Sequence, residues 1–275
     1  MQEDTYPCDD PVPIEHEPRH HLVIVNDFVR AFAVEIPPYD RTLCHHHAHE
    51  YLMYVAGIAD IISAPRDQKP ETSLYKDQEC HLAPAGMIHV VENLTDATFR
   101  NILLEFLPKA SGLRRGPDPR LGERRIARIR QRFDSRMVSA YVLSMLQSSE
   151  VEISGPAVLA SPYGHEMELV ELGGGITKLN KFEDLVWLRP SETGLVRSLA
   201  TATARAVVFQ LGMRDPQPST VRKRTGEPLK RLRAHAESPR LTTPRSAPYT
   251  VLPSTARPKV FPAAPEASRR TTCWL

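Results

Sequence analysis

The chain alternates short hydrophobic segments with turn residues over most of its length. The segment His21–Pro38 alternates hydrophobic and polar positions, is rich in β-branched and aromatic residues, and ends in two prolines. Similar segments follow at 50–64, 79–94 and 99–108, and the same character returns between 138 and 211. Short strands at intervals of about ten residues are typical of a β-sandwich or barrel. The pattern therefore predicts an all-β fold.

A different pattern separates the two β regions. The segment Ser111–Arg136 is basic and rich in turn residues. Its apolar residues have the spacing of one side of a short helix: Leu121, Ile126, Ile129 and Phe133. We therefore predict a basic linker at 109–136 that contains one short helix.

The second β region repeats the first in the same order. The paired segments are VRAFAVEI from Val29 with VSAYVLSM from Val138, HEYLMYVAG from His49 with HEMELVELG from His165, HLAP ending at Pro84 with WLRP ending at Pro190, and ILLEF from Ile102 with AVVFQ from Ala206. Four pairings in one order predict a duplicated β domain.

Charge divides the chain into a body and a tail. From Arg214 to Leu275 there are 13 Lys and Arg against 4 Asp and Glu, while the rest has 22 basic and 29 acidic residues. Ten of the 25 prolines also lie in this tail, which has no sustained apolar period. Such a segment buries too little surface to offset its ordering entropy. We predict a disordered tail at 214–275 and no nucleic-acid partner, since its charge alone is not a binding motif.

Cysteine usage and the N-terminus indicate a cytoplasmic protein. The four cysteines are scattered without a CxxC pair, so neither a zinc ribbon nor a disulfide framework is predicted. The first 18 residues are acidic and proline-rich, unlike a signal peptide, and no apolar run is long enough to cross a membrane. The cluster from Glu15 to His21 is predicted to be a solvated arm, with a cap on a barrel mouth as the alternative.

The stretch CHHHAHEY carries the candidate chemistry. His45, His47 and His49 recur at every second position, so on a strand they share one face. Three such positions span too far for one ion unless the chain turns near Ala48. The simplest set of metal ligands is His45 and His47, followed by His49 or Glu50 after the turn. A fourth ligand must then come from another part of the chain. The best such residue is His89, which follows a Pro-Gly turn.

These residues resemble the two motifs of the cupin family. Pro84, Gly86, His89 and Asn93 match PxGxxHxxxN, and Glu50 and Gly57 match the E-x6-G half of the first motif. The departures are Tyr39 and Gln78 where the family has glycines, and only two residues between His47 and Glu50. The likeness covers about 23–107 well and 138–211 weakly.

The resemblance implies two double-stranded β-helix (jelly-roll) barrels and a metal held by His45, His47, His49 or Glu50, and His89. Neutral imidazoles with one carboxylate suit a divalent first-row transition metal such as Fe, Mn, Ni or Zn. The alternative is a histidine-rich turn without metal, in which His89 is a core residue. The second half keeps only His165 and Glu166, so we predict a degenerate barrel.

The expected organisation is an arm at 1–18, a metal-binding cupin barrel at 19–108, the linker, a degenerate barrel at 137–213, and the tail. The expected function is that of a metal-dependent cupin acting on a small molecule as a dioxygenase, isomerase or lyase. A non-catalytic ligand-binding or structural bicupin is the alternative. A small-molecule substrate or ligand is the expected partner, no membrane is expected, and a homodimer is compatible with this organisation.

Overall fold

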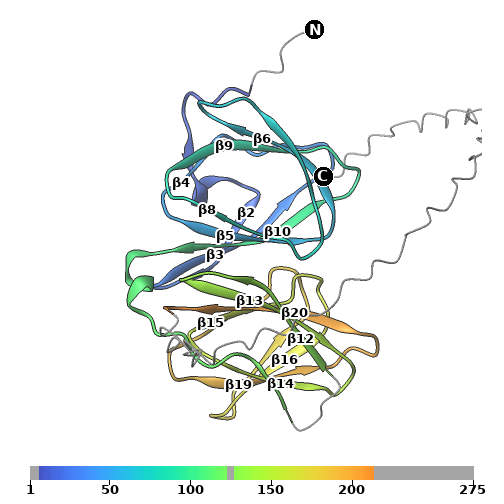
Figure 1. Ribbon diagram of the computed structural model, residues 1–275. Helices are drawn as coiled ribbons and strands as arrows, with labels where there is room; N and C mark the ends of the chain where they lie inside the picture. The colour runs from blue at the N-terminus through green and yellow to red at the C-terminus, as the bar shows by residue number, and fades with distance from the viewer. Residues whose placement is uncertain (1–5, 123–126, 214–275) are drawn as a thin grey trace, which may run out of the picture. The chain divides into compact units, whose positions relative to one another are not determined.

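The computed structural model describes residues 6–122 and 127–213. These residues form four five-stranded sheets, two in each half of the chain, which confirms the all-β prediction and the two barrels (Figure 1). Both barrels belong to one compact unit. Within the described residues, no helix is long and apolar enough to cross a membrane. The predicted disordered tail lies outside the described residues.

The first barrel consists of two sheets whose strands alternate along the chain. One sheet has the order β1-β4-β9-β6-β7 and the other β2-β3-β10-β5-β8. The strands are β1 (Val12–Pro13), β2 (His20–Val25), β3 (Val29–Ile36), β4 (His45–His47), β5 (Tyr51–Ala56), β6 (Ala59–Pro65), β7 (Glu71–Tyr75), β8 (Cys80–Ala83), β9 (Met87–Asn93) and β10 (Phe99–Phe106). A 3-10 turn, η1 (Ile14–His16), joins β1 to β2.

The second barrel has the same strand order as the first. Its sheets are β11-β14-β19-β16-β17 and β12-β13-β20-β15-β18. The strands are β11 (Arg120–Leu121), β12 (Ala127–Asp134), β13 (Val138–Met145), β14 (Glu150–Ser154), β15 (Ala157–Ala160), β16 (Met167–Glu171), β17 (Ile176–Leu179), β18 (Leu185–Leu188), β19 (Thr193–Ser198) and β20 (Ala204–Leu211). The duplication predicted from the sequence is therefore present.

One of the four predicted repeat pairings is wrong. Strand order makes β5 the equivalent of β15, whereas the sequence pairing matched β5 with the segment at His165, which leads into β16. The three other pairings join equivalent strands, although two of them are one residue out of register. Phe106 pairs with Val29 just as Leu211 pairs with Val138, and Ala83 pairs with Tyr51 just as Leu188 pairs with Ala157. Apolar strands of similar composition explain the mismatch.

The predicted helix in the linker is also wrong. Ile129 and Phe133 lie in strand β12, which pairs with β13 along its length, and Leu121 lies in β11, which pairs with β14. Ile126 lies outside the described residues. The exposure of β12 alternates, because its apolar side chains face the barrel and its arginines face outward. Sheet pairing has overridden an apolar spacing that fits a helix as well. Among the described residues between the two barrels, the one helical segment is a 3-10 turn, η2 (Pro108–Gly112).

Each barrel encloses its own apolar interior, and a third cluster is shared by both. The first interior includes Ile14, Phe32 and Leu103, and the second includes Ile153, Leu169 and Val196. Residues of β3, β5 and β10 pack in one cluster with residues of β13, β15 and β20. The candidate site lies in the first interior.

Candidate metal centre

Strands β4 and β9 bring the predicted histidines together. His45 lies directly opposite His89 in this antiparallel pair, and His47 follows two residues later on the same face. All three side chains are buried, whereas His46 between them is half-buried on the other face of the strand. The alternation of a β-strand thus selects His45 and His47 from the histidine run, as the sequence predicted.

The ring nitrogens of these three histidines converge. The Nε2 atom of His47 lies 3.2 Å from Nε2 of His45 and 3.3 Å from Nε2 of His89. Two nitrogens that each bind one ion at about 2.1 Å, at tetrahedral or octahedral angles, are about 3.0–3.4 Å apart. Each of these two pairs therefore has the spacing of two ligands of one metal ion. The set whose ligand atoms all lie within 4.8 Å of one another is His20, His45 and His47.

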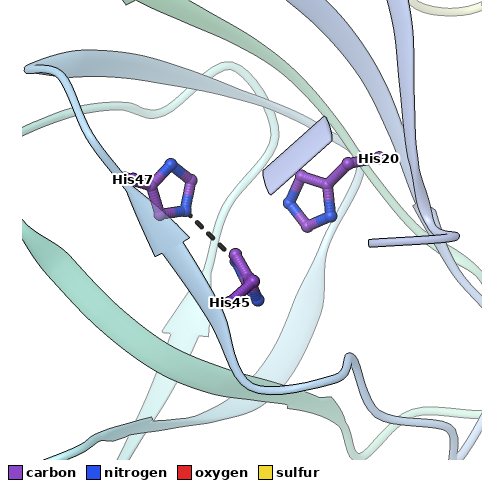
Figure 2. A group of neighbouring side chains, drawn as sticks. All are labelled: His20, His45 and His47. Atoms are coloured by element: carbon purple, nitrogen blue, oxygen red, sulfur yellow. Dashed lines mark hydrogen bonds between the residues drawn. The ribbon is translucent and has the colours of Figure 1, made fainter. Parts of the chain in front are cut away.

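A fourth imidazole, that of His20, joins the cluster from β2. One nitrogen of His20 lies within 4.8 Å of nitrogens of His45 and His47, and its ring centroid is 4.7 Å from that of His45 (Figure 2). Its Nδ1 atom donates a hydrogen bond of 2.6 Å to Glu17, whose carboxylate also accepts from the backbone of Leu43, just before β4. Burial alone would raise the pKa of Glu17, but these hydrogen bonds lower it, so the carboxylate is ionised.

His20 and Glu17 correct the prediction for the segment from Glu15 to His21. The sequence predicts a solvated arm, yet Glu17 is 1% exposed and His20 7% exposed. Glu15, His16 and His21 do point outward. The segment therefore contributes Glu17 and His20 to the barrel interior, which neither the solvated arm nor the cap on the barrel mouth had predicted.

An oxygen atom lies next to the Nδ1 atom of each clustered ring. Nδ1 of His45 donates to the carbonyl of Leu43 at 2.9 Å, and Nδ1 of His89 lies 3.3 Å from the Ser63 hydroxyl. Nδ1 of His47 lies 3.6 Å from Oε1 of Glu105, a buried carboxylate on β10. The hydrogen bonds of His45 and His89 are of the kind that fixes the ring orientation of metal-binding histidines. The contact between His47 and Glu105 is longer than a hydrogen bond.

Glu105 is held by a cation on its other side. Its Oε2 atom lies 2.5 Å from a guanidinium nitrogen of Arg30. Burial raises the pKa of Glu105, and the neighbouring Arg30 opposes that change. The strand pairing places Glu105 directly opposite Arg30. Sequence reasoning did not select either residue, because they belong to strands without a motif.

Burial keeps the clustered imidazoles neutral. Desolvation, followed by repulsion from the neighbouring histidines, lowers the pKa of His47 to about 2 and holds that of His45 well below its usual range. Desolvation lowers the pKa of His89 to about 4. Neutral imidazole is the form that binds metals. Since the Nδ1 atom of His45 donates to the Leu43 carbonyl, its Nε2 atom carries the lone pair, which faces the other histidines.

Two predicted ligands are not brought to the cluster. His49 and Glu50 are both half-buried, beyond the end of β4, and neither lines the cavity around the histidines. The chain does turn after His47, as predicted, but β5 then runs in the opposite sheet with Tyr51 as its first inward residue. The Tyr51 ring stacks on that of His47 with centroids 4.0 Å apart. His20 occupies the place in the cluster that had been predicted for His49 or Glu50.

A cavity of about 170 Å³ adjoins the histidine cluster. Its wall is mostly apolar, with Val34, Ile61 and Phe99 among its residues, and it also includes His81 and Asn101. An apolar cavity of about 150 Å³ accommodates benzene. The volume beside the cluster is therefore large enough for a small cyclic molecule.

The second barrel has apolar residues or glycine where the first has its polar site. The pairing that places His45 opposite His89 places Ile153 opposite Gly194. By the same comparison of registers, Ile129 replaces His20 and Leu169 replaces Ser63. A Cβ atom added at Gly194 would lie 2.7 Å from Leu169, so an imidazole there would require repacking.

His165 lies elsewhere than the repeat pairing indicated. The equivalent of the HxH motif is the end of β14, not the segment around His165. The Nδ1 atom of His165 accepts a hydrogen bond of 3.0 Å from the backbone of Arg205. Within the described residues, the second barrel groups no metal-binding histidines.

A disulfide joins Cys8 to Cys44, immediately before His45, which corrects the expectation that the cysteines are unpaired. It ties the segment before β1 to the start of β4. Disulfides are typical of oxidising compartments. The cytoplasmic location stays a prediction, and this disulfide is an observation against it.

The fold resembles that of several solved structures. A salicylate 1,2-dioxygenase variant from Pseudoaminobacter salicylatoxidans in complex with gentisate is 12% identical, with a TM-score of 0.50 and coverage of 73% of this chain and 76% of that one. AerE from Microcystis aeruginosa is 10% identical, with a TM-score of 0.49 and coverage of 71% and 98%. A cupin domain from Bordetella pertussis Tohama I is 22% identical over 32% and 90%, with a TM-score of 0.31.

No family model matches the sequence, and no curated protein does. The structural likeness concerns the fold alone at these identities. Two barrels, each of two five-stranded sheets in the same order, make up the described part of the chain. The likeness to the salicylate 1,2-dioxygenase variant covers both barrels and is a likeness of fold.

Proposed function

We propose that the first barrel binds one divalent first-row transition metal and acts on a small molecule in the adjoining cavity. The observation that carries this proposal is the convergence of the Nε2 atoms of His45, His47 and His89, at 3.2 and 3.3 Å. Without a metal, a single Nε2 proton on His47 would serve only one of its two neighbours, so a buried ring nitrogen would stay without a partner, which is costly. His20 is the fourth nitrogen ligand.

The chemistry is that of a metal-dependent enzyme of the dioxygenase, isomerase or lyase kind. A bound Fe, Mn, Ni or Zn ion would supply Lewis-acid activation of substrate oxygens, and redox chemistry in the case of iron or manganese. The chain's own residues orient the ligand rings through Leu43, Ser63 and Glu105, and the apolar wall excludes water from the small ring beside them.

A histidine outside the cluster is placed to move a proton. His81 on β8 lines the cavity, and its side chain is 40% exposed. Its Nε2 atom lies 3.6 Å from a carboxylate oxygen of Glu79, and its ring packs on that of Tyr75. An imidazole in this position is suited to general acid–base catalysis on a bound substrate.

Elemental analysis of full-length protein, purified without a histidine tag or chelating resin, tests the metal. We expect close to one metal ion per chain, and His89→Ala should lose it while the protein stays folded. The matched controls are His46→Ala, on the other face of β4, and His165→Ala in the second barrel. Both should keep the metal.

Two results would contradict this proposal. Wild-type protein without metal, even after incubation with each candidate ion, would indicate a non-catalytic binding or structural barrel. Equal loss of metal from His89→Ala and His165→Ala would place a ligand in the second barrel.

A further inference from the structure

Two buried asparagines of the first barrel differ in their hydrogen bonding. The side chain of Asn93 donates to the carbonyls of Ile36, Pro37 and Ala97 and accepts from Thr95. Asn101 is 3% exposed, yet its Oδ1 has no hydrogen-bond partner, and neither amide atom bonds to another described residue. Buried amides without partners are rare and destabilising, so Asn101 requires an explanation.

Asn101 lines the cavity beside the histidines. It lies on β10 between two inward-facing apolar residues, Phe99 and Leu103, and its strand neighbours are Val34 and Val55. The charged residue next to it, Arg100, points to the outer face, where it bonds Glu35 at 2.7 Å. The Asn101 amide therefore faces the cavity in apolar surroundings.

The strand register sets the distance from Asn101 to the cluster. Val34 on β3 pairs with Asn101 on one side and with His20 on the other. Neighbouring strands are about 4.8 Å apart, so the backbones of Asn101 and His20 are about 10 Å apart. Both side chains line the cavity, on either side of Val34.

The second barrel supports a functional reason for this asparagine. Asn101 pairs with Val34, and the equivalent pair in the second barrel is Ala206 with Leu143. The buried polar residue is thus present in the barrel that has the histidines and is replaced by alanine in the barrel that has Ile153 and Gly194 in their places. Barrel construction does not itself require an amide at this position.

We infer that Asn101 is the specificity-determining residue of the cavity, where its amide hydrogen-bonds an uncharged polar group of the ligand. An anionic group there would be desolvated among valines, phenylalanine and leucine without a counter-charge. The ligand class is therefore a small cyclic molecule whose oxygen group reaches the histidine cluster at one end. Its other end carries a hydroxyl, carbonyl or comparable neutral group. This inference rests on the proposed function.

The first test needs no ligand. Asn101→Leu removes an unpartnered buried amide, so the melting temperature of the metal-free protein should rise by a few degrees. The matched control, Asn93→Leu, removes an amide with several partners and should lower it. A lower melting temperature for Asn101→Leu as well would show that Asn101 is a structural residue and would overturn the inference.

The second test measures specificity with two probes, benzoate and 4-hydroxybenzoate, on metal-loaded full-length protein. Wild type should bind 4-hydroxybenzoate at least about tenfold more tightly, because the hydroxyl pairs with Asn101. Asn101→Leu and Asn101→Ala should lose this preference at unchanged metal content. A preference that persists in both variants, or is absent from wild type, would overturn the inference, as would binding of neither probe.

Failure of the proposed function has a different signature. Wild type would then hold no metal, while the melting temperatures of the two leucine variants would still be measurable. A rise for Asn101→Leu without metal in the wild type would keep Asn101 as a ligand contact and remove the metal from the site.

Discussion

Glu105 lies behind His47, with Oε1 3.6 Å from the Nδ1 atom of the ring. The two residues come from opposite sheets of the barrel, β10 and β4, so this contact joins the sheets at the candidate metal centre. A carboxylate behind a ligand histidine raises its basicity and fixes its orientation. Glu105 thereby couples the histidine cluster to Arg30 on β3.

Glu105→Gln should weaken metal binding while retaining the fold. Loss of an outer carboxylate partner typically costs about 10–100-fold in metal affinity. The measurement is a competition titration against a chelator of known affinity. Glu171→Gln, an exposed carboxylate in the second barrel, is the control and should bind as wild type. Unchanged metal affinity in Glu105→Gln would show that Glu105 forms the ion pair with Arg30 but does not support His47.

His20→Ala decides whether the centre has three or four nitrogen ligands. If His20 is a ligand, its loss should reduce metal affinity by at least about tenfold, since a ligand contributes more than an outer partner. The neighbouring residue provides the control, because His21 is exposed and His21→Ala should leave affinity unchanged. Metal affinity equal to wild type in His20→Ala would restrict the centre to His45, His47 and His89.

The difference between the predicted and observed clusters has a physical reason. His45, His47 and His89 are visible in the sequence because an HxH run and PxGxxHxxxN are local patterns. His20 and Glu105 reach the site through strand register, and a register over many residues leaves no local signal. His49 and Glu50 were misplaced because the turn after His47 carries the chain into the opposite sheet.

The fold was predictable to the level of strands and their duplication. Alternation located most strands, but it did not distinguish a strand from a helix at Ile129 and Phe133, where apolar spacing fits both. It also did not show that β5 and β16 occupy different positions in their barrels. Both questions depend on which strands pair, and pairing is a long-range property.

The Cys8–Cys44 disulfide should stabilise the first barrel. It closes a loop of 36 residues, for which chain entropy gives about 3–4 kcal/mol. Cys8→Ser should therefore lower the melting temperature, and a reducing agent should have the same effect on wild type. Cys80→Ser is the control, because Cys80 is a free cysteine. Equal melting temperatures with and without reductant would show that the pair is not bonded in solution.

Metal-free protein should lose stability as the pH falls from 7 towards 4. The pKa values of His45, His47 and His89 are lowered in the folded state, so below the usual value of about 6.5 the unfolded chain binds more protons. Each such histidine then lowers the free energy of unfolding by about 1.4 kcal/mol per pH unit, until the pH reaches its folded-state pKa.

The triple variant with glutamine at these three positions isolates this effect from the ordinary titration of carboxylates. Denaturant titrations at pH 7, 6, 5 and 4 should give a steeper loss of unfolding free energy in wild type than in the variant. The difference should arise below about pH 6.5 and grow towards pH 4, where His89 begins to protonate in the folded state. Parallel pH profiles would mean that the three rings take up protons over the same pH range in the folded and the unfolded protein, so that burial does not lower their pKa values.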